Sequence, residues 1–287
     1  MSNIRKAFEN GKAFIPFITC GDPDLETTKA AVREMVKNGA DLIELGIPFS
    51  DPTAEGPVIQ EANVRALSGG VTTDKIFEMV KELRSGSFAG TDRAAHSGGP
   101  VTGDGAIGEP DGTEPVTVPM VFMTYANVVY SYGAERFIST CAGIGIDGII
   151  LPDLPFEEKE EFLPVCRKYG VDLISLVAPT SEDRIAMIAK EAEGFLYIVS
   201  SLGVTGVRSE ITTDLGSIVK TVRENTDIPC AVGFGISTPE QAGKMAAVSD
   251  GAIVGSAIVK LLAKYGKDAP AEIGRYVKSM KDGVREA

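Results

Sequence analysis

Besides Asp41 at its start, the segment DLIELGIPFSDPTAEGP, which covers residues 41–57, contains three carboxylates that lie close together. Glu44 interrupts an apolar run, and Asp51 and Glu55 follow within eleven positions. In a strand, Leu42 and Glu44 lie on the same face, so Glu44 is expected to point inwards beside apolar side chains. Burial of that kind raises the pKa of a carboxyl group towards neutrality, as a general acid requires. Glu44 is therefore the first candidate for acid–base chemistry; the alternative is a carboxylate that a salt bridge or hydrogen bonds satisfy at a strand end.

Few other residue types are placed to share that chemistry. The only histidine, His96, falls in a stretch rich in Gly, Ser and Thr, and we expect it to be a solvated loop residue. The four cysteines are widely spaced and form no CxxC pair, so neither a disulfide framework nor a metal site is predicted. No lysine stands at the ends of the predicted strands, which argues against a Schiff-base aldolase. Acid–base chemistry is left to carboxylates, Tyr, Lys or Cys.

Glycine-rich segments close the last three predicted strands. They are SSLGVTGVRS (200–209), VGFGIST (232–238) and IVGSAIVK (253–260), and each leads towards a helix. Glycine lets main-chain N–H groups approach an anion closely, and a helix N-terminus favours negative charge. A single such glycine is more often a turn that requires positive φ. Three such loops at adjacent strand ends instead favour a phosphate site, with Arg208 as a candidate contact.

Apolar runs alternate with amphipathic segments and predict the elements that position these groups. The helix-like segments include DLETTKAAVREMVKNG and TTDKIFEMVKELR. Eight parallel strands in about 250 residues match a (β/α)8 TIM barrel, an α/β fold. An open doubly wound sheet is the competing topology, but no GxGxxG follows the first strand. A helix is expected after each of the eight strands, which we place near residues 14–19, 41–45, 118–123, 147–151, 172–177, 195–199, 229–233 and 250–254.

Residues 85–117 interrupt this alternation between the second predicted helix and the third strand. They are rich in Gly, Ser, Thr, Asp and Pro and have no apolar period, so a disordered insertion is expected there. In a barrel it would hang from the N-terminal face, opposite the active site. The whole chain, residues 1–287, is therefore predicted to be a single barrel domain with one low-complexity insertion.

The net charge and the hydropathy pattern exclude several classes of partner. The 40 acidic and 28 basic residues give a formal charge of -12, which argues against nucleic-acid and anionic-membrane partners. No stretch reaches the roughly 18 apolar residues of a membrane helix, and the N-terminus lacks the features of a secretory signal. A cytoplasmic protein is predicted.

Seven segments in order resemble the α subunit of tryptophan synthase: FIPFITCGDPD, ELGIPFSDPTAEGPVIQEA, FMTYANVVYSYG, LPDLPFEE, VSSLGVTGVR, VGFGIS and GSAIVK. The similarity covers nearly the whole chain apart from residues 85–117. Members of this family are (β/α)8 barrels that cleave indole-3-glycerol phosphate into indole and glyceraldehyde 3-phosphate, a lyase reaction of tryptophan biosynthesis. The resemblance implies no cofactor in this chain, a pyridoxal-phosphate β subunit as partner, and an α2β2 heterotetramer.

The resemblance also implies roles for individual residues. The acid–base glutamate of the family falls on Glu44, and its second catalytic carboxylate falls on Glu55, where the best-known members have aspartate. This departure adds one methylene group, which a small shift of a mobile loop would accommodate. For the four aromatic residues the alternative is ordinary core packing. The implied substrate-binding residues are Phe17, Tyr125, Tyr197 and Phe234 around the indole, Thr205 on a loop near Glu55, and Gly206, Gly235, Gly255 and Ser256 at the phosphate.

Two other functions stay open from the sequence. One is a different enzyme on the same phosphate-binding barrel, acting on another phosphorylated aromatic precursor. The other is a catalytically weak barrel that serves mainly to dock on and activate a β subunit, which Glu55 and the insertion raise as an alternative. The release of indole from indole-3-glycerol phosphate separates the first alternative from the family's reaction, and stimulation of a β subunit without any cleavage would identify the second.

Overall fold

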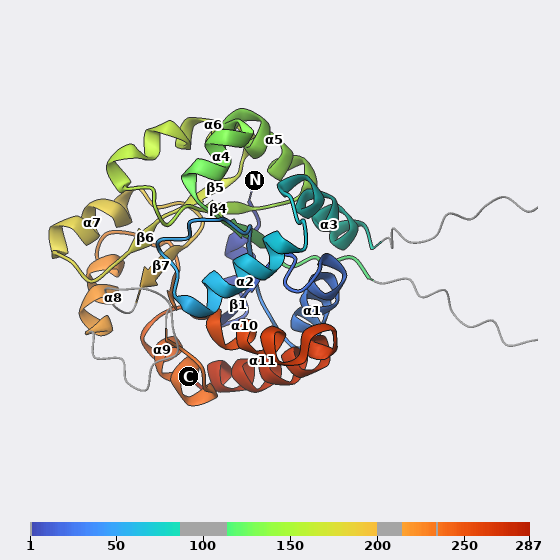
Figure 1. Cartoon of the computed structure of the whole chain (residues 1–287). Coiled ribbons are helices and arrows are strands. Elements are labelled where there is room, and N and C mark those ends of the chain that lie inside the picture. The colour runs from blue at the N-terminus through green and yellow to red at the C-terminus, as the bar shows by residue number, and fades with distance from the viewer. Residues whose placement is uncertain (1, 87–113, 200–213, 234) are drawn as a thin grey trace, which may run out of the picture.

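The computed structural model describes residues 2–86, 114–199, 214–233 and 235–287. His96, Thr205, Gly206, Arg208 and Phe234 lie outside the described residues. Parallel strands form a central barrel, and helices surround it (Figure 1). Within the described ranges, no helix is both long and apolar enough to cross a membrane.

The strands form one parallel sheet that closes on itself through the fifth predicted strand. That strand is divided at Ser175 into β5, which pairs with β4, and β6, which pairs with β7. Because a single residue separates the two pieces, one strand bridges both ends of the sheet and eight strand positions close the barrel, as predicted. The strands are β1 (Ala13–Thr19), β2 (Ile43–Gly46), β3 (Met120–Met123), β4 (Gly148–Ile150), β5 (Asp172–Ile174), β6 (Leu176–Val177), β7 (Leu196–Val199), β8 (Cys230–Gly233) and β9 (Gly251–Val254).

The predicted alternation of strand and helix is confirmed, with a second α-helix after β2, β3 and β9. Pro57 at the start of α2 and the buried Ile59, Ala62 and Ala66 make a helix of PVIQEANVRALS, so the segment TTDKIFEMVKELR becomes α3 rather than the second helix. The helices are η1 (Ile4–Phe8), α1 (Leu25–Lys37), α2 (Pro57–Ser68), α3 (Thr73–Ser85), α4 (Ala126–Tyr132), α5 (Ala134–Ile144), η2 (Phe156–Glu161), α6 (Leu163–Tyr169), α7 (Glu182–Lys190), α8 (Leu215–Arg223), α9 (Pro239–Val248), α10 (Ser256–Tyr265), η3 (Gly266–Asp268) and α11 (Ala269–Arg285).

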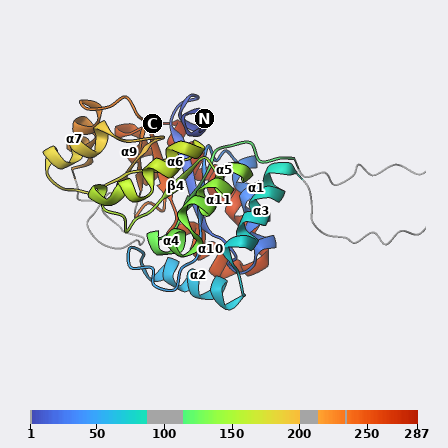
Figure 2. The same ribbon diagram turned by 90° about the horizontal axis from the view of Figure 1, so that it is seen from above.

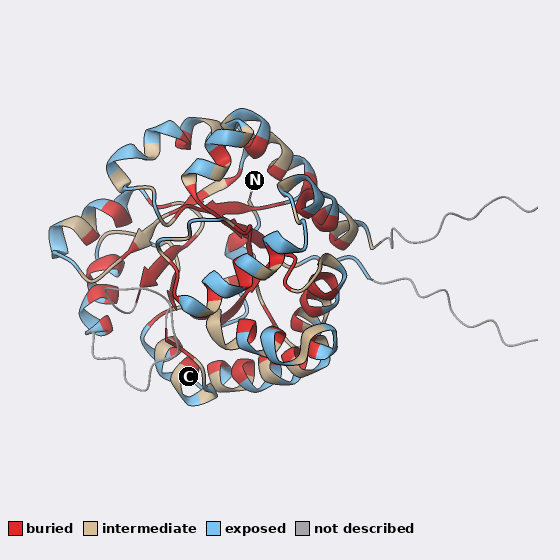
Figure 3. Cartoon of the chain, viewed as in Figure 1, coloured by how far each residue is buried: buried red, intermediate tan, exposed pale blue. Residues whose placement is uncertain are grey.

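Side chains of each strand alternate between two apolar layers. Along β1, Ile15 and Phe17 belong to the cluster inside the barrel, whereas Phe14 and Ile18 pack outwards against the helices. Figure 3 shows the consequence, since the strands are almost entirely buried while most helices carry a buried stripe and an exposed one. Inward-facing residues of neighbouring strands therefore meet inside the barrel.

The helix α2 lies at the carboxyl ends of the strands, because it follows the short loop after β2. In Figure 1 it crosses in front of the barrel, and Figure 2 places it at the end opposite the two chain termini. This end of the barrel is where enzymes with this fold have their active sites.

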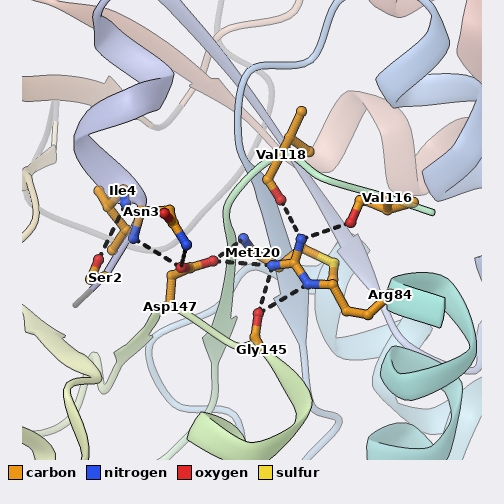
Figure 4. Close-up of polar contacts among 9 residues, drawn as sticks. All are labelled: Ser2, Asn3, Ile4, Arg84, Val116, Val118, Met120, Gly145 and Asp147. Carbon is orange, nitrogen blue, oxygen red and sulfur yellow. Dashed lines mark hydrogen bonds and ion pairs between the residues drawn. The ribbon is translucent and has the colours of Figure 1, made fainter.

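The base of the predicted insertion is held at the other end of the barrel by Arg84, the penultimate residue of α3 (Figure 4). Its guanidinium makes five hydrogen bonds, to the carbonyl oxygens of Gly145, Val116 and Val118 and to the carboxylate of Asp147. Asp147 also accepts the N–H of Met120, the first residue of β3, so the cluster lies at the amino ends of β3 and β4.

The ends of the predicted insertion range belong to the described structure. Ser85 is the last residue of α3, and Val116 is buried, with its N–H donating to the carbonyl of Leu83 (2.8 Å). Residues 87–113 lie outside the described residues, so the disorder expected there stays a prediction.

Candidate active site

Glu44 and Glu55 line one cavity at the carboxyl end of the barrel. Glu44 is the second residue of β2, where Phe17 on β1 and Val121 on β3 are its register partners. It is only 1 % exposed, as its position in an inward-facing apolar row predicts. Glu55 stands one residue before the N-cap of α2 and is 6 % exposed. The loop between β2 and α2 thus brings two buried carboxyl groups into the same space.

The cavity gathers seven of the predicted site residues from five parts of the chain. The remaining lining residues are apolar, so the two acids face hydrophobic walls and the glycine loops. The described lining residues are Phe17, Glu44, Glu55, Ile59, Met123, Tyr197, Gly235, Ile236, Ile253, Gly255 and Ser256.

Burial controls the protonation of both acids. It raises the pKa of Glu44 to about 8, and the nearby charge of Glu55 adds to the effect. Burial likewise raises the pKa of Glu55 to about 7, against a hydrogen bond from Asn63 that lowers it. Among the described residues, Oε2 of Glu44 is buried without a hydrogen-bond partner. Near neutral pH the site can therefore hold one protonated acid and one carboxylate, the combination that general acid–base catalysis needs.

The carboxyl group of Glu55 is held by a residue that the sequence did not single out. Nδ2 of Asn63 on α2 donates to Oε2 of Glu55 over 2.7 Å, and Asn63 is itself 4 % exposed. Gln60 on the same helix donates through Nε2 to the main-chain oxygen of Glu55 (2.7 Å). The spacing of Ile59 and Asn63, four positions apart, places both on the same side of a helix, but it does not show that Asn63 meets Glu55.

Tyr125 supports the loop that carries Glu55 and is not among the described residues that line the cavity. Its hydroxyl oxygen accepts the N–H of Ala54, next to Glu55, over 3.0 Å. Its ring stacks on Phe49, with centroids 5.1 Å apart. Burial raises the pKa of Tyr125, so the phenol stays neutral. The structure thus places this predicted indole contact behind the loop that carries Glu55.

The glycine end of the cavity is built by the loops after β8 and β9. Gly235 has φ +79°, a conformation that favours glycine. Gly255 is the N-cap of α10 and packs close to Phe17, since an added Cβ would lie 3.2 Å from its Cδ1. Ser256 is the first residue of that helix, whose N-terminal amides carry partial positive charge. The described lining residues include no basic side chain, so main-chain amides are the donors available to an anion.

A second cavity of about 760 Å³ lies beside Thr53 and Ala54, between the ends of β4 to β6 and α7. It is the larger of the two, but its basic residues are already paired: Arg184 with Glu157, and Lys159 with Glu191. Because the acid pair lies in the smaller cavity, that cavity is the candidate for the site of chemistry. Within the described parts of the chain, no cluster of three or more His, Cys, Asp or Glu residues is placed to hold a metal ion.

The family model for the tryptophan synthase alpha chain matches residues 3–89 and 110–285. The chain belongs to the tryptophan synthase alpha chain family. A tryptophan synthase alpha chain from Lacticaseibacillus casei is 44% identical over 284 residues, covering 99% of this chain and 96% of the relative. One from Geotalea uraniireducens is 42% identical over 292 residues, covering 99% and 98%.

Solved structures of alpha chains have the same fold. Tryptophan synthase subunit alpha from Legionella pneumophila superposes with a TM-score of 0.81 at 34% identity, over the full length of both chains. A chain of Mycobacterium tuberculosis tryptophan synthase superposes with a TM-score of 0.81 at 31% identity, covering 99% of this chain and 98% of that one. These structures support the TIM barrel fold and not the open doubly wound sheet.

Proposed function

We propose that this chain cleaves indole-3-glycerol phosphate into indole and glyceraldehyde 3-phosphate. One observation carries the proposal: Glu44 and Glu55 are buried in a single cavity, and an oxygen of Glu44 has no partner among the described residues. A buried acid without a partner is unfavourable for folding and is a mark of functional sites. Membership of the tryptophan synthase alpha chain family supports this choice of substrate.

In the proposed reaction, protonated Glu44 delivers its proton to C3 of the indole ring. The positively charged ring then withdraws the electrons of the bond between C3 and C3′, while the ionised Glu44 removes the proton of the C3′ hydroxyl. That hydroxyl oxygen becomes the aldehyde oxygen of glyceraldehyde 3-phosphate, and indole leaves with its aromaticity restored. The substrate supplies its own electron sink, so this route needs no lysine for a Schiff base and no cofactor of this chain.

Glu55 has the complementary role in this proposal. As a carboxylate it accepts the hydrogen bond of the indole N–H and stabilises the positive charge that develops on nitrogen. The apolar lining strengthens this interaction, because electrostatic attraction grows in a site with low dielectric constant. Phe17 and Tyr197 would hold the ring, and the amides of Gly235, Gly255 and Ser256 would hold the phosphate. Thr205, Gly206 and Phe234 remain proposed contacts outside the described residues.

The family assignment also suggests the fate of the indole. An alpha chain by name implies a second chain, and we propose a β subunit that carries pyridoxal phosphate and consumes the indole in an α2β2 assembly in the cytoplasm. The product and its consumer would then be brought together by docking of the two subunits.

The proposal is tested by incubating purified chain with indole-3-glycerol phosphate and measuring indole, with and without a β subunit. Indole release that disappears in Glu44→Gln supports it. Absence of cleavage under both conditions, in a protein that still stimulates the β subunit, would establish the activating role instead. Absence of both effects would favour another phosphorylated aromatic substrate.

A further inference from the structure

The two acids of the cavity differ in the hydrogen bonds that they receive. Oε2 of Glu55 accepts the amide of Asn63 over 2.7 Å, whereas Oε2 of Glu44 has no partner among the described residues. Both carboxyl groups are buried, and Asn63 is buried with them. Because an amide nitrogen can donate but never accept, the contact is favourable when Glu55 is ionised.

Other titratable groups around the pair do not create this difference. Burial raises the pKa of the Tyr197 phenol on β7, and the nearby charge of Glu44 raises it further. Burial and the charge of Glu55 raise the pKa of Tyr125, the N-cap of α4, in the same way. Both phenols therefore stay neutral. Neither a lysine nor an arginine lines the described walls of the cavity, and Arg65 on α2 is held in a bidentate ion pair with Asp22.

We propose that Asn63 is a positioning residue for the cleavage reaction, which keeps Glu55 in the carboxylate form and thereby leaves the shared proton on Glu44. This inference rests on the roles given to the two acids in the proposed function. The same hydrogen bond occupies Oε2 of Glu55 and leaves Oε1 to accept the indole N–H. Asn63 acts through Glu55 and does not need to touch the substrate.

The expected effect follows from the strength of hydrogen bonds to charged groups. Two acids in one apolar cavity share a proton, because the state with both ionised is disfavoured. Burial raises the pKa of Glu55 and so disfavours its ionised form, whereas the hydrogen bond from Asn63 lowers that pKa and favours the ionised form. Loss of a hydrogen bond to a carboxylate shifts such a balance by roughly tenfold or more. Without Asn63, the singly protonated pair would place its proton on Glu55 more often, and the ratio of molecules protonated on Glu44 to molecules protonated on Glu55 would fall by about that factor.

The test compares Asn63→Leu, which keeps the branched shape of the side chain and removes the donor, with Gln60→Ala as a matched control. Gln60 donates from the same helix to the same residue, but to its main-chain oxygen. For Asn63→Leu we expect kcat/KM at pH 7 to fall by up to about tenfold and the acidic limb of the pH profile to move to higher pH. For Gln60→Ala we expect any loss to be the same factor at every pH. A profile of Asn63→Leu that superposes on that of the unmodified protein after scaling would overturn the inference.

A second measurement needs no turnover. Infrared spectra of the free protein follow the protonated carboxyl groups with pH, and Glu44→Gln and Glu55→Gln assign the two signals. We expect the Glu55 signal to persist to higher pH in Asn63→Leu and in Asn63→Ala, in variants whose urea midpoints show that they are folded. Unchanged titration would refute the role of Asn63 even in an active enzyme. Absence of indole release from the unmodified chain would instead contradict the proposed function and leave the titration result standing.

Discussion

Replacement of Glu44 by glutamine should abolish most of the activity and stabilise the folded protein. Burial raises the pKa of Glu44 from 4.5 to about 8, so ionisation of this group opposes folding. Glutamine has nearly the same shape and no charge. If Glu44 instead formed a structural ion pair, Glu44→Gln would destabilise the folded protein, because removal of one partner leaves the other charge buried and unpaired.

The magnitude follows from proton linkage. The folded state binds the proton more tightly than the unfolded state, so stability is lost as pH rises above 4.5, and the loss becomes constant above pH 8. At about 1.36 kcal/mol per pKa unit, the full loss of folding stability is roughly 5 kcal/mol, and about 1 kcal/mol of it has already occurred at pH 5. The variant should therefore gain about 4 kcal/mol relative to the parent between pH 5 and pH 9. Any cost of burying the glutamine amide is the same at both pH values and cancels in this difference.

The assay is urea unfolding of parent and variant at pH 5 and pH 9, with Glu158→Gln as the control, since Glu158 is exposed on η2. The same samples are assayed for indole release, which should drop by about 10² to 10⁴ because general acid catalysis contributes that much. A stability difference that does not change with pH would show that Glu44 is not desolvated as described. Near-normal turnover would remove it from the mechanism.

Three further changes have defined outcomes. Glu55→Asp should keep activity and Glu55→Ala should lose most of it in steady-state assays, and equally small effects would show that Glu55 is not the partner acid. Gly233→Ala would place a Cβ 2.4 Å from the hydroxyl oxygen of Tyr197. Because Tyr197 would have to move and is a proposed contact of the indole ring, product inhibition by indole should weaken. Gly143→Ala is the control, since its Cβ would meet nothing within 4 Å. Deletion of residues 87–113 with a short linker should leave the urea midpoint and turnover unchanged, and lower turnover in a folded protein would contradict that.

Local patterns were sufficient to predict the strand positions, because an inward-facing and an outward-facing apolar layer make each strand an apolar run. The division of the fifth strand at Ser175 could not be predicted in this way. It depends on which neighbours β5 and β6 meet when the barrel closes, and no local periodicity records that. The helix α2 escaped notice because its buried face includes Ala62, Ala66 and the polar Asn63, which weakens the apolar signal.

The pattern of alternating side chains along the strands also predicted part of the site. Strand alternation alone places Glu44 inside the barrel, and its burial is confirmed. The contact between Asn63 and Glu55 spans eight residues and a change of direction between loop and helix. An asparagine in a helix has no distinctive spacing, so only the folded chain shows what its amide meets. Tyr125 is a similar case, because the strand end places it near the site but does not reveal that it holds the loop.

The hydrogen bonds of Arg84 fix the chain on both sides of residues 87–113 at the amino end of the barrel, and we call this attachment site the port. All five of its hydrogen bonds end on main-chain oxygens or on Asp147, so the chain leaves and re-enters the barrel at points set by the barrel itself. A foreign peptide or a small reporter domain grafted between Gly86 and Glu114 would be anchored at that port, on the far side from Glu44. An enzyme immobilised through such a graft would have the carboxyl end of its barrel, with the cavity of Glu44, facing the solution.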